Sequence, residues 1–314
     1  MVNVLFAAPD ALWPAYAEAL PRAFAEKGVR ADLSRAHPAG SVDWIVYAPG
    51  GPIADLAPYA AAKGVLSLWA GVERLVSLVP PGLPLARMVD EGLRQGMTEW
   101  VAAHVLRHHL GTDVHVTGQD GVWRKGAGFP PSKLAPERPV TVLGLGELGL
   151  SCALALCALG FPVTGWSRSP KEDRRLHRLL HGRDALDDAL RGAEVVVLLT
   201  PLTRHTENLM DARRLRLPAP GYALLNPGRG ALIDDAALLA ALDEGAVGHA
   251  TLDVFRQEPL PPSHPFWAHP RVTVTPHVAA ETQAPTAARV IAENVRRGEA
   301  GEPLLHLVDR ARGY

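Results

Sequence analysis

The sequence predicts an α/β protein of two domains, each built around a doubly wound parallel sheet, with the first domain discontinuous. Three observations favour this fold class. The length of 314 residues exceeds what one ordinary core accommodates and suits two domains. Short apolar runs alternate with amphipathic or alanine-rich stretches, which is the rhythm of β-α-β units. Residues 284–297 indicate a long final helix, which we expect to return to the first domain.

The first domain is predicted from short apolar runs typical of strands that are buried on both faces of a sheet. Helices are expected between them at residues 12–27 and 53–62. The expected strands are residues 2–8, 43–48, 64–70 and 85–89.

The second domain is predicted from a further series of strands with interleaved helices. A long helix at residues 95–110 and a polar, glycine-rich stretch at 111–138 come before it. We therefore place the first domain at residues 1–98 and 286–314, and the second at 99–285. Its six expected strands are residues 140–143, 163–166, 195–199, 222–225, 249–253 and 272–275.

Composition excludes several classes of function. Lysine plus arginine (32) nearly balances aspartate plus glutamate (33), so no electrostatic footprint for nucleic acid or an anionic membrane is expected. No apolar stretch has the length of a membrane span, and the first residues lack a secretory signal, so a cytoplasmic location is expected. Cys152 and Cys157 have no nearby histidine, so we interpret them as small core residues of a helix and expect no metal site.

A glycine-rich turn is the strongest local motif. Gly144, Gly146 and Gly149 form a G-x-G-x-x-G pattern that ends an apolar strand and opens a helix at 148–159. In that context the first glycine permits the tight turn, the second lets a pyrophosphate approach the backbone, and the third lets helix and strand pack closely. Glu147 and Leu148 lie in the first turn of this helix, whose N–H groups and dipole favour phosphate. The motif predicts a dinucleotide site in a Rossmann-like domain; a purely structural turn is the alternative.

The next strand end favours a phosphorylated dinucleotide. NAD sites carry an acid here for the ribose hydroxyls, whereas this chain has Ser167, Arg168, Ser169 and Lys171. Serine and arginine can donate to a 2′-phosphate and neutralise it, so NADP(H) is expected over NAD(H). The alternative is an ordinary solvated strand end. Pro201, after a later strand, is a further expected cofactor contact.

Three later loops carry the candidate chemistry, each following a predicted strand. They contain Arg229 in Asn-Pro-Gly-Arg-Gly, Asp253 and Glu258 in Asp-Val-Phe-Arg-Gln-Glu-Pro-Leu, and His277 in Thr-Pro-His. Loops at the carboxyl ends of parallel strands share one edge of the sheet, where ligands bind. Each residue alone would be ambiguous, but three on one edge are difficult to ascribe to chance.

With these motifs in order, the sequence resembles the D-isomer-specific 2-hydroxyacid dehydrogenase family, and within it the glyoxylate/hydroxypyruvate reductase A branch. The resemblance extends over essentially the whole chain, to the run Val308–Tyr314. It implies that the first domain is a flavodoxin-like substrate-binding domain. It also implies that Arg229 holds the substrate's carboxylate and keto oxygen, and that His277 protonates the developing alkoxide as hydride arrives.

The resemblance assigns further roles. Glu258 would orient the imidazole, and Asp253 would anchor the nicotinamide carboxamide, with a charged strand end as its alternative. The backbone N–H groups of the loop Ala70, Gly71 and Val72 would bind the substrate carboxylate. Arg87 is a candidate second anion contact or, equally, a solvated strand residue.

Two departures from the family pattern concern the pocket. Pro227 and Gly228 stand where a small or apolar pair is usual, which puts the placement of Arg229 in doubt. Trp69 stands where this branch tends to have glycine, and its indole could narrow the pocket. Trp44 and Tyr47 are either pocket liners or ordinary core aromatics.

The sequence thus predicts an NADPH-dependent reductase that converts glyoxylate to glycolate and hydroxypyruvate to D-glycerate. The alternatives are another D-2-hydroxyacid dehydrogenase, of D-lactate or phosphoglycerate type, and a non-catalytic dinucleotide-sensing scaffold that resembles a corepressor. The resemblance further implies a homodimer whose interface uses the helix at 95–110 and the stretch 111–138, with Trp123. The histidine pair His108-His109 is interpreted as a feature of that helix's C-terminus.

Overall fold

The computed structural model describes residues 1–123 and 133–313, which divide into two compact units. Unit 1 comprises Met1–Leu93 and Glu281–Tyr314, and unit 2 comprises Arg94–Ala280. Unit 1 is therefore discontinuous in sequence, and the two crossings of the chain fall after residues 93 and 280, where we had expected 98 and 285.

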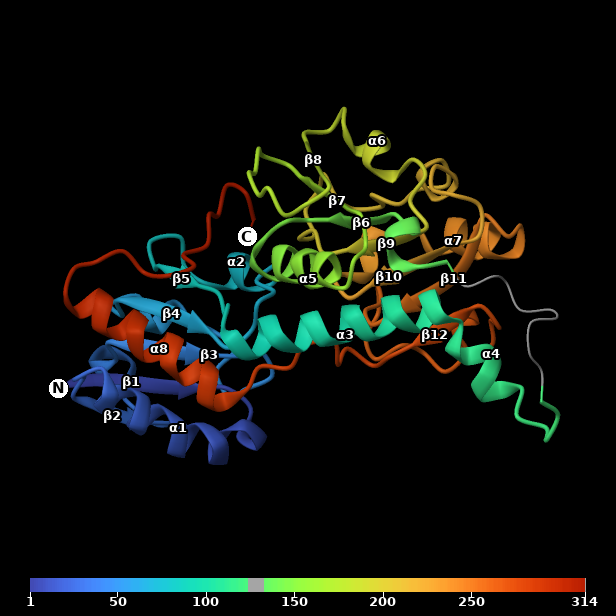
Figure 1. Cartoon of the computed structure of the whole chain (residues 1–314). Helices are drawn as coiled ribbons and strands as arrows, with labels where there is room; N and C mark the ends of the chain where they lie inside the picture. The colour runs from blue at the N-terminus through green and yellow to red at the C-terminus, as the bar shows by residue number, and fades with distance from the viewer. Residues whose placement is uncertain (124–132, 314) are drawn as a thin grey trace. The chain divides into compact units, whose positions relative to one another are not determined.

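Unit 1 contains a five-stranded parallel sheet, as the fold prediction required (Figure 1). The strand order is β2-β1-β3-β4-β5. Its interior strands are almost fully buried, which explains their continuous apolar sequences. Its elements are β1 (Val2–Ala7), α1 (Trp13–Glu26), β2 (Ala31–Ser34), β3 (Trp44–Tyr47), β4 (Gly64–Ser67), α2 (Leu75–Leu78), β5 (Leu85–Ala86) and α8 (Ala284–Glu299).

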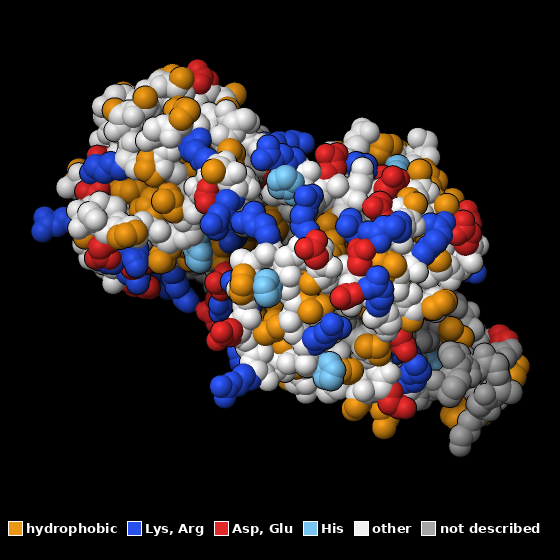
Figure 2. Space-filling view, turned by 90° about the horizontal axis from the view of Figure 1, so that it is seen from above, with side chains coloured by type: hydrophobic (Ala, Val, Ile, Leu, Met, Phe, Trp, Pro, Cys, Tyr) orange, Lys and Arg blue, Asp and Glu red, His pale blue; other side chains and the backbone are white. Residues whose placement is uncertain are grey.

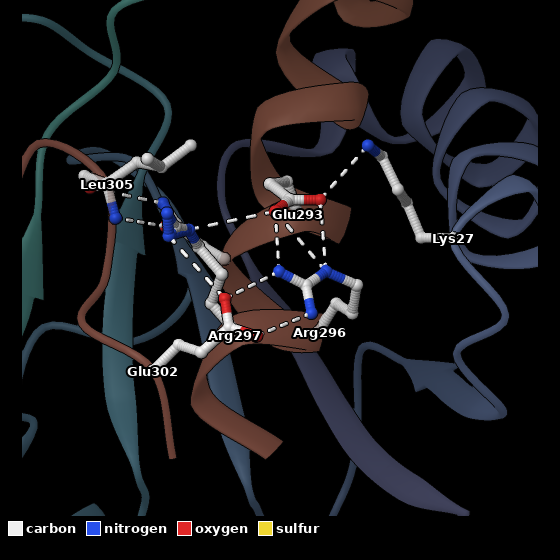
Figure 3. Close-up of polar contacts among 7 residues, drawn as sticks. Lys27, Glu293, Arg296, Arg297, Glu302 and Leu305 are labelled. Atoms are coloured by element: carbon white, nitrogen blue, oxygen red, sulfur yellow. Dashed lines mark hydrogen bonds and ion pairs between the residues drawn. The ribbon is translucent and has the colours of Figure 1, made fainter. Parts of the chain in front are cut away.

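The final helix α8 belongs to unit 1, because it packs along α1 (Figure 1). Its buried face carries alanines with Ile291 and Val295, and its exposed face carries charges. One ion pair joins the two helices, between Lys27 at the end of α1 and Glu293 of α8, at 3.0 Å (Figure 3). Arg296 of α8 pairs with Glu293 of the same helix at 2.9 Å and with Glu302, just beyond it, at 2.8 Å. The return of the chain to the first sheet is thus fixed by packing, with the surface ion pairs adding a smaller contribution.

Unit 2 contains a seven-stranded parallel sheet in the order β12-β11-β10-β9-β6-β7-β8. The order reverses at β6, which is the strand that carries the glycine-rich turn, and such a switch point is where ligands bind in doubly wound sheets. Its elements are β6 (Val140–Leu143), α5 (Glu147–Ala158), β7 (Val163–Ser167), β8 (Arg178–His181), α6 (Leu186–Leu190), β9 (Val195–Leu198), β10 (Tyr222–Asn226), α7 (Asp235–Asp243), β11 (Val247–Leu252) and β12 (Val272–Val274).

Helix α3 (Glu91–Leu110) starts in unit 1 and lies mainly in unit 2. The buried Asp90 caps its first turn by accepting the N–H of Leu93 at 3.0 Å. Val101 and Val105 are fully buried in the core of unit 2. The short helix α4 (Thr112–Thr117) follows within the stretch expected to be irregular, and residues 124–132 of that stretch, like Tyr314, lie outside the described residues.

Three expectations about local structure were wrong. The helix expected at 53–62 is only a 3-10 turn at Ala57–Tyr59, since Pro58 lacks an N–H and its ring clashes with an α-helical carbonyl. Strands β2 and β8 were missed. Both are edge strands with half-exposed, polar sequences, so they lack the apolar signal of the buried strands.

The surface agrees with the balanced composition. Figure 2 shows basic and acidic side chains interspersed over the visible face, with apolar side chains between them. None of the helices in the described part of the chain is long and apolar enough to cross a membrane.

Candidate active site

The loop that carries His277 has an unusual backbone. His277 follows β12 and adopts a φ of +57°, in the left-handed region that only a few per cent of non-glycine residues occupy. Its N–H donates to the carbonyl of Asp253 at 2.8 Å. The conformation turns the chain sharply at His277, and its half-exposed side chain projects from the loop.

A single buried carboxylate holds this turn. Asp253, at the end of β11, is 1% exposed. Its Oδ1 accepts the Thr275 hydroxyl at 2.6 Å and the N–H of Val278 at 2.9 Å, and its Oδ2 accepts the N–H of Ala279 at 2.9 Å. Hydrogen bonds to an ionised acceptor are stronger than neutral ones. Asp253 therefore binds the loop on both sides of His277, a function that sequence reasoning missed when it assigned this residue to the cofactor.

Glu258 fixes the orientation of the imidazole. Its Oε2 lies 2.7 Å from Nδ1 of His277, while its Oε1 accepts the N–H of Phe255 at 2.8 Å. The carboxylate of Glu258 is thus anchored to its own loop and accepts a hydrogen bond from the Nδ1–H of His277. Nε2, on the opposite side of the ring, is not used by this contact. This acid-histidine pair can present a proton at Nε2 and stabilise the charged imidazolium.

The loop that carries Arg229 is held by its own side chains. Asn226, 1% exposed, donates to the carbonyl of Arg229 at 2.9 Å and accepts the N–H of Gly228 at 3.2 Å. A Cβ on Gly228 would lie 2.8 Å from the carbonyl oxygen of Leu198, so no other residue fits there. The glycine of the Pro-Gly pair is therefore explained by a close approach to β9, whereas no contact among the described residues explains Pro227. Arg229 itself is half-buried, and its Nη1 donates to the carbonyl of Gly228 at 2.6 Å.

The Arg229 and Glu258 loops lie against each other. A Cβ on Gly230 would come within 2.0 Å of the carbonyl carbon of Phe255, so this glycine is required for the contact. The N–H of Asp253 also donates to the carbonyl of Asn226 at 3.1 Å. The structure thus brings the predicted arginine, glutamate and histidine loops together at the carboxyl edge of β10, β11 and β12.

The glycine-rich turn after β6 has a shape that suits a dinucleotide. Gly144 has a φ of +104°, and a Cβ there would lie 2.5 Å from Leu199. A Cβ on Gly149 would lie 1.8 Å from the carbonyl oxygen of Gly144. By contrast, the Cβ position of Gly146 has nothing within 4 Å, and no side chain caps helix α5 there. Glycine is thus required at 144 and 149 by the packing of the turn itself. The open space at Gly146, beside uncapped N–H groups, instead fits a pyrophosphate.

Thr200 is a site residue that sequence reasoning missed. Its backbone lies beside the Gly144 turn, its side chain is 5% exposed, and its hydroxyl has no hydrogen-bond partner among the described residues. Buried hydroxyls are normally satisfied, so this one is a candidate cofactor contact. The sequence signal that could have indicated Thr200 is the Thr-Pro pair that follows a buried strand. The carbonyl of Pro201 accepts the Thr206 hydroxyl at 2.7 Å.

The residues at the end of β7 differ in exposure. Arg168, Ser169 and Lys171 are exposed. Ser167 is 7% exposed, and its hydroxyl donates to the carbonyl of Ser169 at 2.6 Å, so it can donate to a phosphate only by giving up that bond. The exposed cations are therefore the better candidates for an anionic group.

The candidate substrate loop belongs to unit 1. Ala70 and Gly71 are half-buried and Val72 is buried. Trp69, 43% exposed, is anchored through its backbone to the Ser67 hydroxyl, at 3.0 Å for both its N–H and its carbonyl. Arg87 is half-buried, and its N–H donates to the carbonyl of His306 at 3.1 Å.

The two aromatic residues left open by the sequence belong to the core of unit 1. Trp44 is 1% exposed, and its indole N–H donates to Glu299 at 2.8 Å. Tyr47 is 3% exposed and lies within the same sheet. The structure thus agrees with the alternative that they are ordinary core aromatics.

A cluster of neutral histidines lies where helix α3 packs on the second sheet. His108 accepts or donates a bond to the Thr251 hydroxyl at 2.9 Å, and its ring lies 4.9 Å from that of His249. Burial, reinforced by the neighbouring His249 and Arg107, lowers the pKa of His108 to about 3. Burial and Arg107 lower the pKa of His249 to about 4. His108 is thus a half-buried residue that packs α3 against β11, rather than only a feature of the helix end.

Comparison with known proteins agrees with this geometry. Residues 100–279 match the family model described as "D-isomer specific 2-hydroxyacid dehydrogenase, NAD binding domain". A glyoxylate/hydroxypyruvate reductase A from Photorhabdus laumondii subsp. laumondii is 39% identical over 277 residues, which cover 86% of this chain and 87% of the relative. A counterpart from Serratia proteamaculans is 38% identical over 271 residues, covering 82% and 84%.

Solved structures give the same result. A D-isomer specific 2-hydroxyacid dehydrogenase from Xanthobacter autotrophicus Py2, in complex with NADPH and MES, has a TM-score of 0.88 and 38% identity, covering 100% of this chain and 99% of that one. An NADPH-dependent glyoxylate/hydroxypyruvate reductase from Sinorhizobium meliloti, in complex with NADP and sulfate, has a TM-score of 0.86 and 31% identity over both whole chains. The family predicted from the motifs is confirmed: this chain belongs to the D-isomer specific 2-hydroxyacid dehydrogenases.

Proposed function

We propose that this enzyme reduces glyoxylate to glycolate and hydroxypyruvate to D-glycerate with NADPH, and that His277 is the general acid. The observation that carries the proposal is the 2.7 Å contact of His277 Nδ1 with Glu258, on a loop held by the buried Asp253. The contact orients the ring and reserves Nε2 for the substrate. The names of the relatives, which are glyoxylate/hydroxypyruvate reductases, supply the substrate class.

Each residue has a defined task in the proposed reaction. When bound, the dihydronicotinamide supplies the hydride that attacks the keto carbon. His277 gives its Nε2 proton to the carbonyl oxygen, so the alkoxide becomes a hydroxyl and the imidazole becomes neutral. Glu258 stabilises the imidazolium before this transfer. Arg229 forks onto the carboxylate and the keto oxygen, which fixes the acid and polarises its carbonyl.

Unit 1 contributes anion binding to the proposal. The backbone N–H groups of Ala70, Gly71 and Val72 bind the substrate carboxylate, with Arg87 as a second anion contact. Unsatisfied N–H groups of a loop are suited to a carboxylate because they bind it without a second buried charge.

The proposed cofactor preference is NADPH over NADH. Gly146 and the first turn of α5, including Glu147 and Leu148, would hold the pyrophosphate. Arg168 and Lys171 neutralise the 2′-phosphate. NADPH and NADP are the cofactors named in the complexes of the two relatives, which supports this assignment.

A panel of 2-keto acids tests the function. Oxidation of NADPH is followed with glyoxylate, hydroxypyruvate, pyruvate and phosphohydroxypyruvate, and we expect the first two to give the highest kcat/KM. His277→Gln lowers kcat by at least about 100-fold, the contribution of a general acid, with NADPH binding retained. His269→Gln is the matched control and retains activity, because His269 lies before β12, at the opposite end of the strand from His277. A preference for pyruvate or phosphohydroxypyruvate would assign a different 2-hydroxyacid, and NADPH binding without turnover would favour a sensing scaffold.

Arg168→Ala tests the cofactor preference. Loss of a charge-assisted contact of about 1.5–3 kcal/mol lowers the ratio of kcat/KM for NADPH to that for NADH by at least about tenfold. Arg191→Ala is the control, because this exposed arginine pairs with Asp188 of α6 and is not a proposed cofactor contact. An unchanged ratio in Arg168→Ala refutes the assignment.

We further propose a homodimer in the cytoplasm. Among the described residues of the stretch 111–138, Val116 is 69% exposed, Trp123 92% and Leu134 71%, and exposed apolar side chains such as these are typical of an interface. A second copy covering this region accounts for them. Light scattering with Val116→Glu should then give a monomer, and a monomeric wild-type chain at micromolar concentration would contradict the proposal.

A further inference from the structure

The segment after α8 is fastened beside the outermost strand of the first sheet. The buried Asn294 accepts the N–H of Leu305 at 2.7 Å, next to the ion pairs drawn in Figure 3. Leu307 then forms an antiparallel bridge with Ala86 of β5. The N–H of Val308 donates to Leu85 at 2.8 Å, and its side chain is 7% exposed within the core. This segment therefore covers the edge of β5 and leads the chain toward α2.

Arg310 ends this segment with an unusual set of contacts. Its Nη1 donates to the carbonyls of Val76 at 3.1 Å and Val79 at 2.9 Å. Its Nη2 donates to the carbonyls of Pro80 and Leu83, both at 2.9 Å. One guanidinium thus binds four carbonyls at the end of α2 and in the turn that follows, of which that of Pro80 also accepts the N–H of Leu83 at 3.0 Å. The last carbonyls of a helix have no partners within it, and a cation there is favourable.

Helix α2 is the direct continuation of the substrate loop. The N–H of Val76 donates to the carbonyl of Val72 at 2.9 Å, so the last residue of the loop is part of the first helical turn. Val72 and Leu75 are 2% and 1% exposed, which ties both to the core. On its other side the loop is held by Met88, whose N–H donates to the carbonyl of Trp69 at 3.0 Å. The loop is thus fixed at one end by the sheet and at the other by α2.

A single-turn helix has little stability of its own. The burial of Leu75 and Val79 and the four bonds from Arg310 hold α2 and the turn after it in place. We propose that Arg310 is a positioning residue for substrate binding: through α2 it fixes the N–H groups of Ala70–Val72 at the spacing a carboxylate requires. This inference rests on the proposed function of that loop. It also gives a task to the Val308–Gly313 run that the catalytic chemistry leaves unexplained.

Steady-state kinetics of Arg310→Ala test the proposal. We expect KM for glyoxylate to rise by about tenfold or more, kcat to fall by less than about threefold, and KM for NADPH to stay unchanged. Arg310→Lys gives an intermediate KM, because an ammonium is a point donor and cannot span four carbonyls. Arg312→Ala is the matched control; it lies two residues further on and pairs with Asp309 at the surface, and its KM is unchanged.

Chemical rescue separates positioning from general destabilisation. Guanidinium chloride, far below denaturing concentrations, should lower the KM of Arg310→Ala toward the wild-type value and leave wild type and Arg312→Ala unaffected. A KM in Arg310→Ala equal to that of wild type overturns the proposal. So does a loss confined to kcat.

Hydrogen exchange gives a readout that does not depend on turnover. In Arg310→Ala the amides of Val76 and Val79 should exchange faster, while those of β1 and β3 keep their protection. The exchange measurement still tests the role of Arg310 if no keto acid is a substrate, because it does not depend on the proposed function. Unchanged exchange at Val76 and Val79, or faster exchange throughout unit 1, overturns the proposal.

Discussion

Asp253→Asn is the substitution whose outcome the structure specifies most fully. The buried carboxylate of Asp253 accepts three hydrogen bonds from the His277 loop. An asparagine keeps one acceptor oxygen, which can serve the Thr275 hydroxyl and the N–H of Val278. Its amide nitrogen then faces the N–H of Ala279, donor against donor. The variant loses one charge-assisted bond, weakens two others, and leaves a buried N–H unsatisfied.

The magnitude follows from these losses. A hydrogen bond to a charged group contributes about 1.5–3 kcal/mol, and an unsatisfied buried donor costs about 1–3 kcal/mol. His277 also occupies a left-handed conformation that costs about 1–2 kcal/mol and depends on its surroundings to persist. A weakening of about 2–3 kcal/mol is therefore enough to release the loop. If this is expressed at the transition state, kcat falls by about 30- to 150-fold.

Steady-state kinetics distinguish this role from the cofactor role predicted from the sequence. Loop positioning lowers kcat and leaves KM for NADPH unchanged, whereas an anchor for the carboxamide raises KM for NADPH. Asp234→Asn is the matched control, because Asp234 also accepts a backbone N–H, that of Ala237 at 3.0 Å, at the start of α7. If kcat of Asp253→Asn stays within about threefold of that control, the reasoning is refuted.

Two further predictions concern the glycine turn and the histidine cluster. Gly146→Val should weaken NADPH binding by at least tenfold, about 1.4 kcal/mol, without lowering the unfolding temperature. Gly149→Ala, whose Cβ would lie 1.8 Å from a backbone oxygen, should instead destabilise the fold by about 3 kcal/mol or more. Calorimetry with and without NADPH measures both effects, and equal stability of the two variants would contradict the prediction. His108, with a pKa near 3 in the folded state and about 6.5 when unfolded, binds a proton in the unfolded chain first, so stability is lost as pH falls below about 6.5. When the pH is lowered from 7 to 5, the free energy of unfolding, measured with urea, should fall less in His108→Asn than in wild type, by at most about 2 kcal/mol. Equal falls in the two proteins would refute the effect.

The fold was predictable because its buried strands leave a strong pattern. The strand at 195–198 is a run of valine and leucine with every residue buried, and such runs are typical of central parallel strands. Edge strands leave a weaker pattern. β2 and β8 pair on one side only, so their polar residues meet solvent and the sequence resembles a loop. The expected helix at 53–62 failed for a local reason, since Pro58 overrode the helical composition around it.

The residue types of the candidate site were predictable, whereas their mutual geometry was not. Arg229, Glu258 and His277 follow strands, and parallel strands bring their carboxyl ends to one edge. The bonds that hold these loops depend on register. Asp253 reaches Thr275, Val278 and Ala279 because β11 and β12 pair Leu252 with Val274, which sets the two strand ends level. No local pattern in the sequence fixes that register.

The same limit explains why His277 and Arg310 could not be understood from the sequence alone. A glycine with a positive φ suggests itself from its residue type, but histidine in that conformation gives no such signal. The left-handed turn exists because Asp253 binds both of its flanks, 22 to 26 residues further along the chain. Arg310 meets Val76 across 234 residues. In both cases one charged side chain orders a distant loop by binding its backbone groups, so the loop's geometry is a property of the folded unit. Substitutions of Asp253 and Arg310 should therefore change how the enzyme binds and turns over its substrate without altering any residue proposed to contact it.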